Sequence, residues 1–208
     1  MALQIDPKHD ALVVVDVQRD FCPGGALPVP EGDRVVPVVN RLLHLAKWLA
    51  VATRDWHPAD HCSFVSQGGI WPPHCVAGSP GAEFHPGLAA GDFQHVVSKG
   101  TRPGAEAYSG FEGTDLAARL AQGGIRRVFV CGLATDYCVK ATVLDARQAG
   151  FEAVVITDAI RGVEVRPGDS ASALAAMQAA GAGLASSDEL TGGTRPAAPQ
   201  PEKGGRDR

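Results

Sequence analysis

The sequence has little that would suit a membrane or secreted protein. Its longest apolar stretches, such as residues 11–15, fall far short of the roughly 20 residues that a membrane-spanning helix needs. The first ten residues, MALQIDPKHD, lack the basic start and apolar run of a secretory signal. We therefore expect no membrane partner and a cytoplasmic location.

Cysteine pairs and excess positive charge are also missing. The 208 residues include five cysteines, an odd number without CxxC spacing, which argues against a disulfide framework or a cysteine-rich zinc module and predicts reduced thiols. Nineteen Lys and Arg residues against 23 Asp and Glu residues give a net charge of −4. This balance excludes an electrostatic footprint for nucleic acid and points to a small, non-polyanionic partner.

Apolar, β-branched segments recur along the chain with helical patterns between them. Continuous apolar runs are typical of strands buried on both faces of a parallel sheet. These segments occupy residues 11–17, 49–55, 95–100, 126–132 and 152–159, with a weaker sixth near 183. Helical spacing occurs in residues 33–46, 116–121, 137–149 and 170–180. The alternation predicts a three-layer α/β/α fold with a mainly parallel six-stranded sheet.

Two regions depart from this alternation. Residues 55–91 contain four His and many Gly and Pro residues, and so long a loop in a compact domain is usually functional. From residue 191 onward the chain is Pro, Gly and charge with almost no apolar residue, which predicts a disordered tail over 191–208. Residues 1–190 are expected to form a single domain.

Polar residues follow four of the predicted strands. Asp16, Asp55 and Lys99 lie at strand ends, and Cys138 follows a glycine turn after the fourth strand. Because ligands bind at the carboxyl ends of parallel strands, we expect these side chains to share one crevice. A helix beginning near Tyr137 would place Cys138 in its first turn, where a thiolate is stabilised. Asp16 would then accept the thiol proton.

Each of these residues also has a plainer interpretation. A cysteine at a helix start is often just a small buried apolar group. The carboxylate of Asp16 can be purely structural, satisfied by backbone at the strand end. Lys99, taken alone, is equally well interpreted as a surface lysine whose aliphatic part is buried and whose ammonium reaches solvent.

The histidine-rich loop suggests a metal centre. Asp55 and His57 project from the same side of an extended segment, and His61 or His74 can supply a third ligand. Carboxylate and imidazole ligands suit one divalent ion, Zn²⁺, Fe²⁺ or Mn²⁺. The alternative is a loop whose histidines are ordinary surface polar groups.

Aromatic residues occur near these groups and are candidates for an aromatic slot, although each is also a reasonable core residue. They are Phe21, Trp71, Tyr108 and Phe111.

Several segments, in this order, resemble one known family. VVVDVQRDF, TRDWHPADHCSF, WPPHCVAGSPGAEFHP, VSKGT, AYSGF and VCGLATDYCV are similar to the nicotinamidase (pyrazinamidase) family of isochorismatase-like cysteine hydrolases. The resemblance covers residues 10–187 and implies a Rossmann-like strand order. It also implies the hydrolysis of nicotinamide, and of pyrazinamide, to the acid and ammonia in NAD salvage, with a small carboxamide as the only partner apart from a possible second copy of the chain.

The resemblance assigns roles to individual residues. It implies a catalytic triad of Asp16, Lys99 and Cys138. Backbone N–H groups of Ala134 and Cys138 would form an oxyanion hole, after a cis peptide at Leu133–Ala134. The implied metal ligands are Asp55, His57 and His74, with His61 a ligand only in some members. The implied substrate pocket comprises Phe21, Leu27, Trp71, Tyr108 and Leu133.

Other functions compete with this one. A related amidase would act on a carbamoyl or ureido substrate, or the chain would be an isochorismatase. A non-catalytic relative would serve as an interaction module, although the intact Asp16, Lys99 and Cys138 set disfavours it. A thiol redox or metal-storage protein is disfavoured because no CxxC pair is present.

Overall fold

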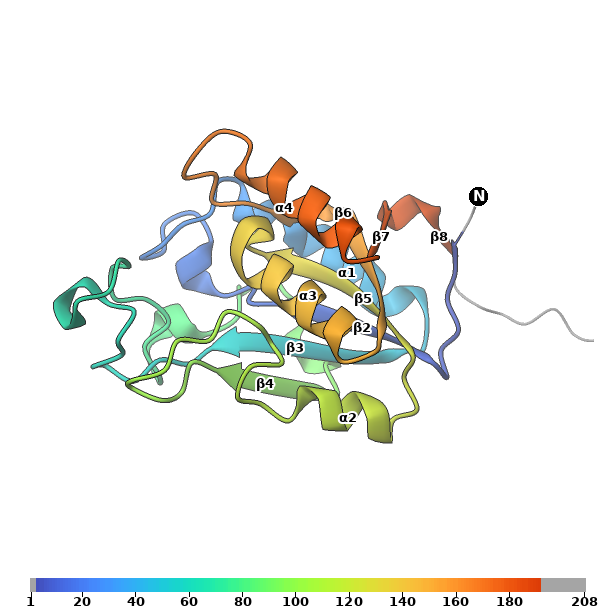
Figure 1. Cartoon of the computed structure of the whole chain (residues 1–208), viewed down its shortest axis with the longest axis horizontal. Helices are drawn as coiled ribbons and strands as arrows, with labels where there is room; N and C mark the ends of the chain where they lie inside the picture. The colour runs from blue at the N-terminus through green and yellow to red at the C-terminus, as the bar shows by residue number, and fades with distance from the viewer. Residues whose placement is uncertain (1–2, 192–208) are drawn as a thin grey trace, which may run out of the picture.

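A parallel six-stranded sheet forms the centre of the computed structural model, which describes residues 3–191 (Figure 1). Its strands lie in the order β4-β3-β2-β5-β6-β7, so the direction of winding reverses between β2 and β5. Ligands of such sheets bind at this switch point. All six predicted strands and the predicted order are confirmed. The strands are β2 (Asp10–Val15), β3 (Leu49–Asp55), β4 (His95–Lys99), β5 (Arg127–Leu133), β6 (Glu152–Arg161) and β7 (Gly183–Ala185).

Helices cover both faces of the sheet because successive strand residues point to opposite sides. On β2, Leu12 and Val14 face one hydrophobic core, whereas Val13 and Val15 face the other. Helix α1 (Val35–Leu45) contributes to the first core. The second is completed by α2 (Leu116–Gln122), α3 (Lys140–Gln148) and α4 (Asp169–Ala179). The predicted three-layer architecture is therefore confirmed.

The third helix begins differently from its prediction. Residues Thr135–Val139 form a five-residue π-helical turn, and regular α-helix starts only at Lys140. Cys138 therefore lies in the π turn and not in the first turn of an α-helix. A π-helical turn contains more residues per turn than an α-helix and commonly occurs at functional sites.

The predicted loop region is fixed by short bridges and 3₁₀ turns. His57 pairs with the segment around Val76, its N–H donating to the Cys75 carbonyl over 3.0 Å. Phe64 and Trp71 form a second isolated bridge. The 3₁₀ turns in this region are η3 (Val65–Gln67), η4 (Pro80–Ala82) and η5 (Ala90–Asp92); elsewhere lie η1 (Arg19–Phe21), η2 (Gly32–Arg34) and η7 (Ser187–Glu189).

The two ends of the described chain pair with each other. Strand β1 (Leu3–Gln4) runs parallel to β8 (Leu190–Thr191), and this small sheet was not predicted. Thr191, assigned to the tail by its composition, is thus paired in β8, and the rest of the predicted tail, 192–208, lies outside the described residues. The domain boundary at residue 190 stays a prediction. Among residues 3–191, no helix combines the length and apolarity needed to cross a membrane.

Candidate active site and metal centre

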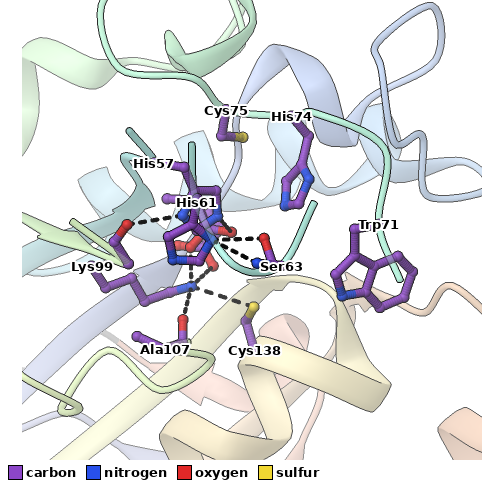
Figure 2. Close-up of polar contacts among 12 residues, drawn as sticks. His57, His61, Ser63, Trp71, His74, Cys75, Lys99, Ala107 and Cys138 are labelled. Atoms are coloured by element: carbon purple, nitrogen blue, oxygen red, sulfur yellow. Dashed lines mark hydrogen bonds and ion pairs between the residues drawn. The ribbon is translucent and has the colours of Figure 1, made fainter. Parts of the chain in front are cut away.

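Side chains from four strand ends meet around one lysine (Figure 2). Nζ of Lys99, at the end of β4, lies 2.9 Å from Oδ2 of Asp16 and 3.4 Å from Sγ of Cys138. It also donates a hydrogen bond to Asp55 and another, of 3.2 Å, to the carbonyl of Ala107. The predicted crevice therefore exists, and the three residues of the implied triad lie together in it.

Asp16 is held rigidly while one of its oxygens stays available. The residue is fully buried and has a φ of 48°, an uncommon backbone conformation for a non-glycine residue. Oγ1 of Thr53 donates to its Oδ1 over 2.7 Å. Within residues 3–191, Oδ2 faces Lys99 but makes no well-angled hydrogen bond. A carboxylate oxygen of Asp16 and Sγ of Cys138 lie within 4.8 Å of each other. The free lone pairs can therefore receive a proton from the thiol.

The electrostatics of Cys138 differ from the prediction of a stabilised thiolate. Burial raises the pKa of this thiol well above its ordinary value; Lys99 opposes the shift, and the carboxylates of Asp16 and Asp55 add to it. The expected effect of a helix N-terminus is outweighed because the sulfur is buried and two carboxylates lie near it. The resting thiol is consequently neutral and needs a base to ionise it.

The charges of the buried carboxylates and ammonium depend on one another. Burial raises the pKa of Asp16, and although Lys99 lowers it, the net shift is upward. Burial also raises the pKa of Asp55, but Lys99 and His57 outweigh this and hold it below the usual range. Burial lowers the pKa of Lys99, and the two carboxylates reverse the shift and raise it well above its ordinary value. Lys99 therefore stays an ammonium and Asp55 a carboxylate.

Three of the four candidate metal ligands converge. One ligand atom each from Asp55, His57 and His74 lies within 4.8 Å of the others, and all three residues are buried. Nδ1 of His57 lies 2.9 Å from the Gly100 carbonyl, and Nδ1 of His74 lies 2.8 Å from that of Pro72. Because a carbonyl can only accept, Nδ1 carries the proton and Nε2 keeps its lone pair for a metal. One carboxylate and two such imidazoles fit a divalent ion.

His61 lies beside this group and is not part of it. Its ring stacks on that of His57 with centroids 4.1 Å apart. Its Nδ1 lies 2.7 Å from Oγ of Ser63 and its Nε2 lies 3.1 Å from the carbonyl of Ala105. Both ring nitrogens are thus engaged, and the candidate role of His61 as a ligand is not supported by this arrangement. Burial lowers the pKa of His61 and of His74, which favours their neutral forms. In His57 burial acts the same way, but Asp55 outweighs it and raises the pKa.

A small cavity of about 40 Å³ lies between the metal-ligand group and Cys138. Five residues of the implied pocket and oxyanion hole line it besides Cys138 itself: Phe21, Leu27, Trp71, Tyr108 and Ala134. Nε1 of Trp71 donates to the Tyr108 hydroxyl over 3.0 Å, which fixes this wall. The peptide bond between Leu133 and Ala134 is cis, as the resemblance implied.

Two predicted aromatic or apolar contacts are wrong. Leu133 does not line the cavity, because its side chain is fully buried in the core beneath α1, where its Cδ1 approaches Gly32. Phe111 does not line the cavity either: it packs against Phe151, with ring centroids 6.1 Å apart, at the core covered by α2, α3 and α4.

Several residues of the site were not predicted. Val29, Glu106, Tyr137 and Val163 also line the cavity. Gln18 lies behind it, where Oε1 accepts from the Asp55 N–H over 2.7 Å and Nε2 donates to the Asp55 carbonyl over 2.8 Å. A glutamine directly after an apolar, strand-like run is a sequence signal that would have pointed to Gln18. Val29, Glu106 and Val163 come from loops whose path the sequence does not define, and Tyr137 lies in the π turn.

An open parallel sheet that brings a cysteine, an aspartate and a lysine together at its switch point, beside three side chains that could hold a metal ion, is the arrangement of a hydrolase of the α/β class. The isochorismatase domain model matches residues 10–189, and the chain belongs to the isochorismatase family.

Similar proteins are known in sequence and structure. Nicotinamidase of Escherichia coli (strain K12) is 46% identical over 198 residues, covering 84% of this chain and 93% of that protein. The structure of Pyrococcus horikoshii pyrazinamidase in complex with zinc has 52% identity and a TM-score of 0.81, covering 86% of this chain and 99% of that one. PnC1 from L. infantum in complex with nicotinate has 38% identity and a TM-score of 0.89, covering 93% and 100%.

Proposed function

We propose that this protein is an amidohydrolase that converts nicotinamide to nicotinate and ammonia, using Cys138 as nucleophile. The observation that carries the proposal is the contact of one buried ammonium, Lys99, with both the Cys138 sulfur and the Asp16 carboxylate, at the floor of an aromatic-walled cavity. The similarity to nicotinamidases and to a nicotinate-bound structure supports this choice of substrate. Pyrazinamide, a carboxamide of similar shape, is proposed as a second substrate.

In the first half of the reaction, Asp16 accepts the proton of Cys138, and the sulfur adds to the carboxamide carbon. Negative charge on the carboxamide oxygen is stabilised by backbone N–H groups of Ala134 and Cys138. The proton held by Asp16 then passes to the leaving nitrogen, which departs as ammonia and leaves a thioester on Cys138. Lys99 stays charged throughout and holds Asp16 in position.

In the second half, a water oxygen attacks the thioester carbon while Asp16 accepts a proton from that water. The carbon–sulfur bond breaks, nicotinate forms, and the thiol regains its proton. A divalent ion held by Asp55, His57 and His74 would supply a Lewis-acidic position that orients the pyridine ring of the substrate, and zinc, iron and manganese all suit this ligand set.

The test is ammonia release from nicotinamide by purified protein. Turnover should fall to the blank for Cys138→Ala and after removal of metal by a chelator, and return on adding Zn²⁺, Fe²⁺ or Mn²⁺. Cys131→Ala is the matched control, because Cys131 is buried in a core away from the cavity. If the wild-type protein binds metal but releases no ammonia from nicotinamide, the proposed substrate is wrong. If Cys138→Ala is fully active, Cys138 is not the nucleophile.

A further inference from the structure

A second, larger cavity adjoins the reactive one. It has a volume of about 450 Å³ and extends over α3 and α4, where Lys140, Ser172 and Ala176 contribute to its lining. Tyr108 and Tyr137 line both this cavity and the small one beside Cys138. The two tyrosines therefore form the wall between the reacting atoms and the larger space.

The wall belongs to a cluster of aromatic rings whose two tyrosines differ in their hydrogen bonding. The Tyr137 ring lies 5.2 Å from that of Trp71 and 5.8 Å from that of Tyr108. Tyr108 is held in place because its hydroxyl accepts the hydrogen bond from Trp71. Tyr137 makes no side-chain hydrogen bond among the described residues and is held by ring contacts and by packing against the second hydrophobic core. Of the two, Tyr137 is the member that can be removed without breaking a hydrogen bond.

The carboxylates of the larger cavity are already engaged. Asp136 accepts hydrogen bonds of 2.9 Å from the N–H groups of Val163 and Glu164. Asp136 thereby ties the π turn to the loop after β6. Asp169 accepts from the N–H of Arg166 over 2.9 Å. Neither anion therefore needs a ligand, and the cavity can receive an uncharged aromatic group without leaving them unpaired.

We infer that Tyr137 sets the upper size limit of the substrate, and that the larger cavity is a latent subsite for an aromatic substituent on the ring of the carboxamide. The inference rests on the proposed function and deepens it. The free space beside Cys138, about 40 Å³, has no room for such a substituent, whereas the space beyond Tyr137 does. Replacement of Tyr137 by alanine joins the two cavities.

The experiment compares nicotinamide with its phenyl-substituted analogues, one for each free ring carbon. In Tyr137→Ala, kcat/KM for at least one analogue, relative to nicotinamide, should rise at least tenfold over the wild-type ratio. Tyr137→Phe should keep the wild-type ratio because the ring remains. Ala176→Trp fills the larger cavity from α4, so the double variant Tyr137→Ala with Ala176→Trp should lose the gain. A gain that persists in the double variant, or no gain in Tyr137→Ala, overturns the inference.

A second measurement does not depend on turnover. The rate at which the Cys138 peptide is alkylated by N-phenyl iodoacetamide, relative to iodoacetamide, should rise in Tyr137→Ala and fall again in the double variant. If wild-type protein releases no ammonia from nicotinamide, the proposed function fails, and the alkylation ratio still tests the joined cavities. If wild-type protein is active and neither ratio changes, only the inference on Tyr137 fails.

Discussion

Lys99 and Asp16 form a buried ion pair, with 2.9 Å between Nζ and Oδ2 and neither side chain exposed to solvent. The same ammonium also faces the carboxylate of Asp55. Two carboxylates therefore share one buried ammonium: they raise the pKa of Lys99 well above its ordinary value, whereas burial and the neighbouring Asp55 raise the pKa of Asp16 against the opposing effect of Lys99. This dependence couples the stability of the fold to the protonation of Asp16.

Replacing Lys99 by methionine should destabilise the protein and abolish activity. Two carboxylates would be left buried without a cation, and removing one partner of a buried ion pair costs about 3–5 kcal/mol. Urea unfolding measures the loss in free energy of unfolding. The double variant Lys99→Met with Asp16→Asn removes one of the stranded charges, so it should recover part of the stability and none of the activity. A single variant as stable as wild type would show that the pair is not desolvated as described.

Gln18 should act as a positioning residue for the metal ligand Asp55. Its side chain binds both backbone polar groups of Asp55, and Nε2 also donates to the Ala82 carbonyl over 2.9 Å. Gln18→Met removes all three hydrogen bonds, and loss of such support typically lowers metal affinity by about 10–100-fold. The measurement is retention of Zn²⁺ against a competing chelator.

A second glutamine, which binds the backbone near the other end of β3, provides the control for Gln18. Oε1 of Gln94 accepts from the N–H of Ala50, near the start of β3, over 2.7 Å. Gln94→Met removes a comparable bond at the end of β3 remote from the metal ligands. It should lower stability and leave zinc retention at the wild-type level. Equal loss of zinc in both variants would mean that Gln18 acts only through general stability.

Glu164 should make part of the stability dependent on pH. Its carboxylate accepts hydrogen bonds from the N–H groups of Gly168 and Ser170, at the start of α4. The hydrogen bonds with Ser170 and Gly168 hold its pKa below the ordinary value of 4.5. A depressed pKa in the folded state adds stability that is present above pH 4.5 and is lost as the pH falls through the lowered value.

Glu164→Gln keeps the shape of this side chain and removes its charge. Wild type should therefore have the higher urea midpoint at neutral pH, and the two midpoints should converge well below pH 4.5. A difference that stays constant across this range would assign the effect to shape and not to charge.

The positions of the catalytic candidates could be predicted because they depend on the periodicity of strands. Apolar runs identify β2, β3, β4 and β5, and the parallel arrangement then requires the residues after them to meet. That Leu133 does not line the cavity could not be predicted. Leu133 is the last residue of β5, and the sequence does not show which face of the sheet its side chain takes there. The raised pKa of Cys138 could not be predicted either, since it depends on the burial of the thiol and on two carboxylates from other strands.

The candidate metal ligands illustrate the same limit. Asp55 and His57 were predictable from their alternation along an extended segment, but His61 and His74 were equivalent candidates in sequence. The structure separates them through their hydrogen-bond partners: in His61 the Ser63 hydroxyl and the Ala105 carbonyl engage both ring nitrogens, whereas His74 uses only Nδ1. Such a distinction depends on the path of a loop with no periodic pattern.

Gly100 should be indispensable for the orientation of His57. It has a φ of 61°, and a Cβ atom added to it would lie 2.4 Å from Cε1 and 2.6 Å from Nδ1 of His57. Gly100→Ala must therefore displace the imidazole whose Nδ1 the Gly100 carbonyl fixes, and zinc binding should fall at least tenfold. Gly104→Ala lies in the same loop, where an added Cβ meets nothing within 4 Å, and should bind zinc as wild type does. Calorimetric titration with Zn²⁺ distinguishes the two variants, and undiminished binding by Gly100→Ala would exclude His57 as a ligand.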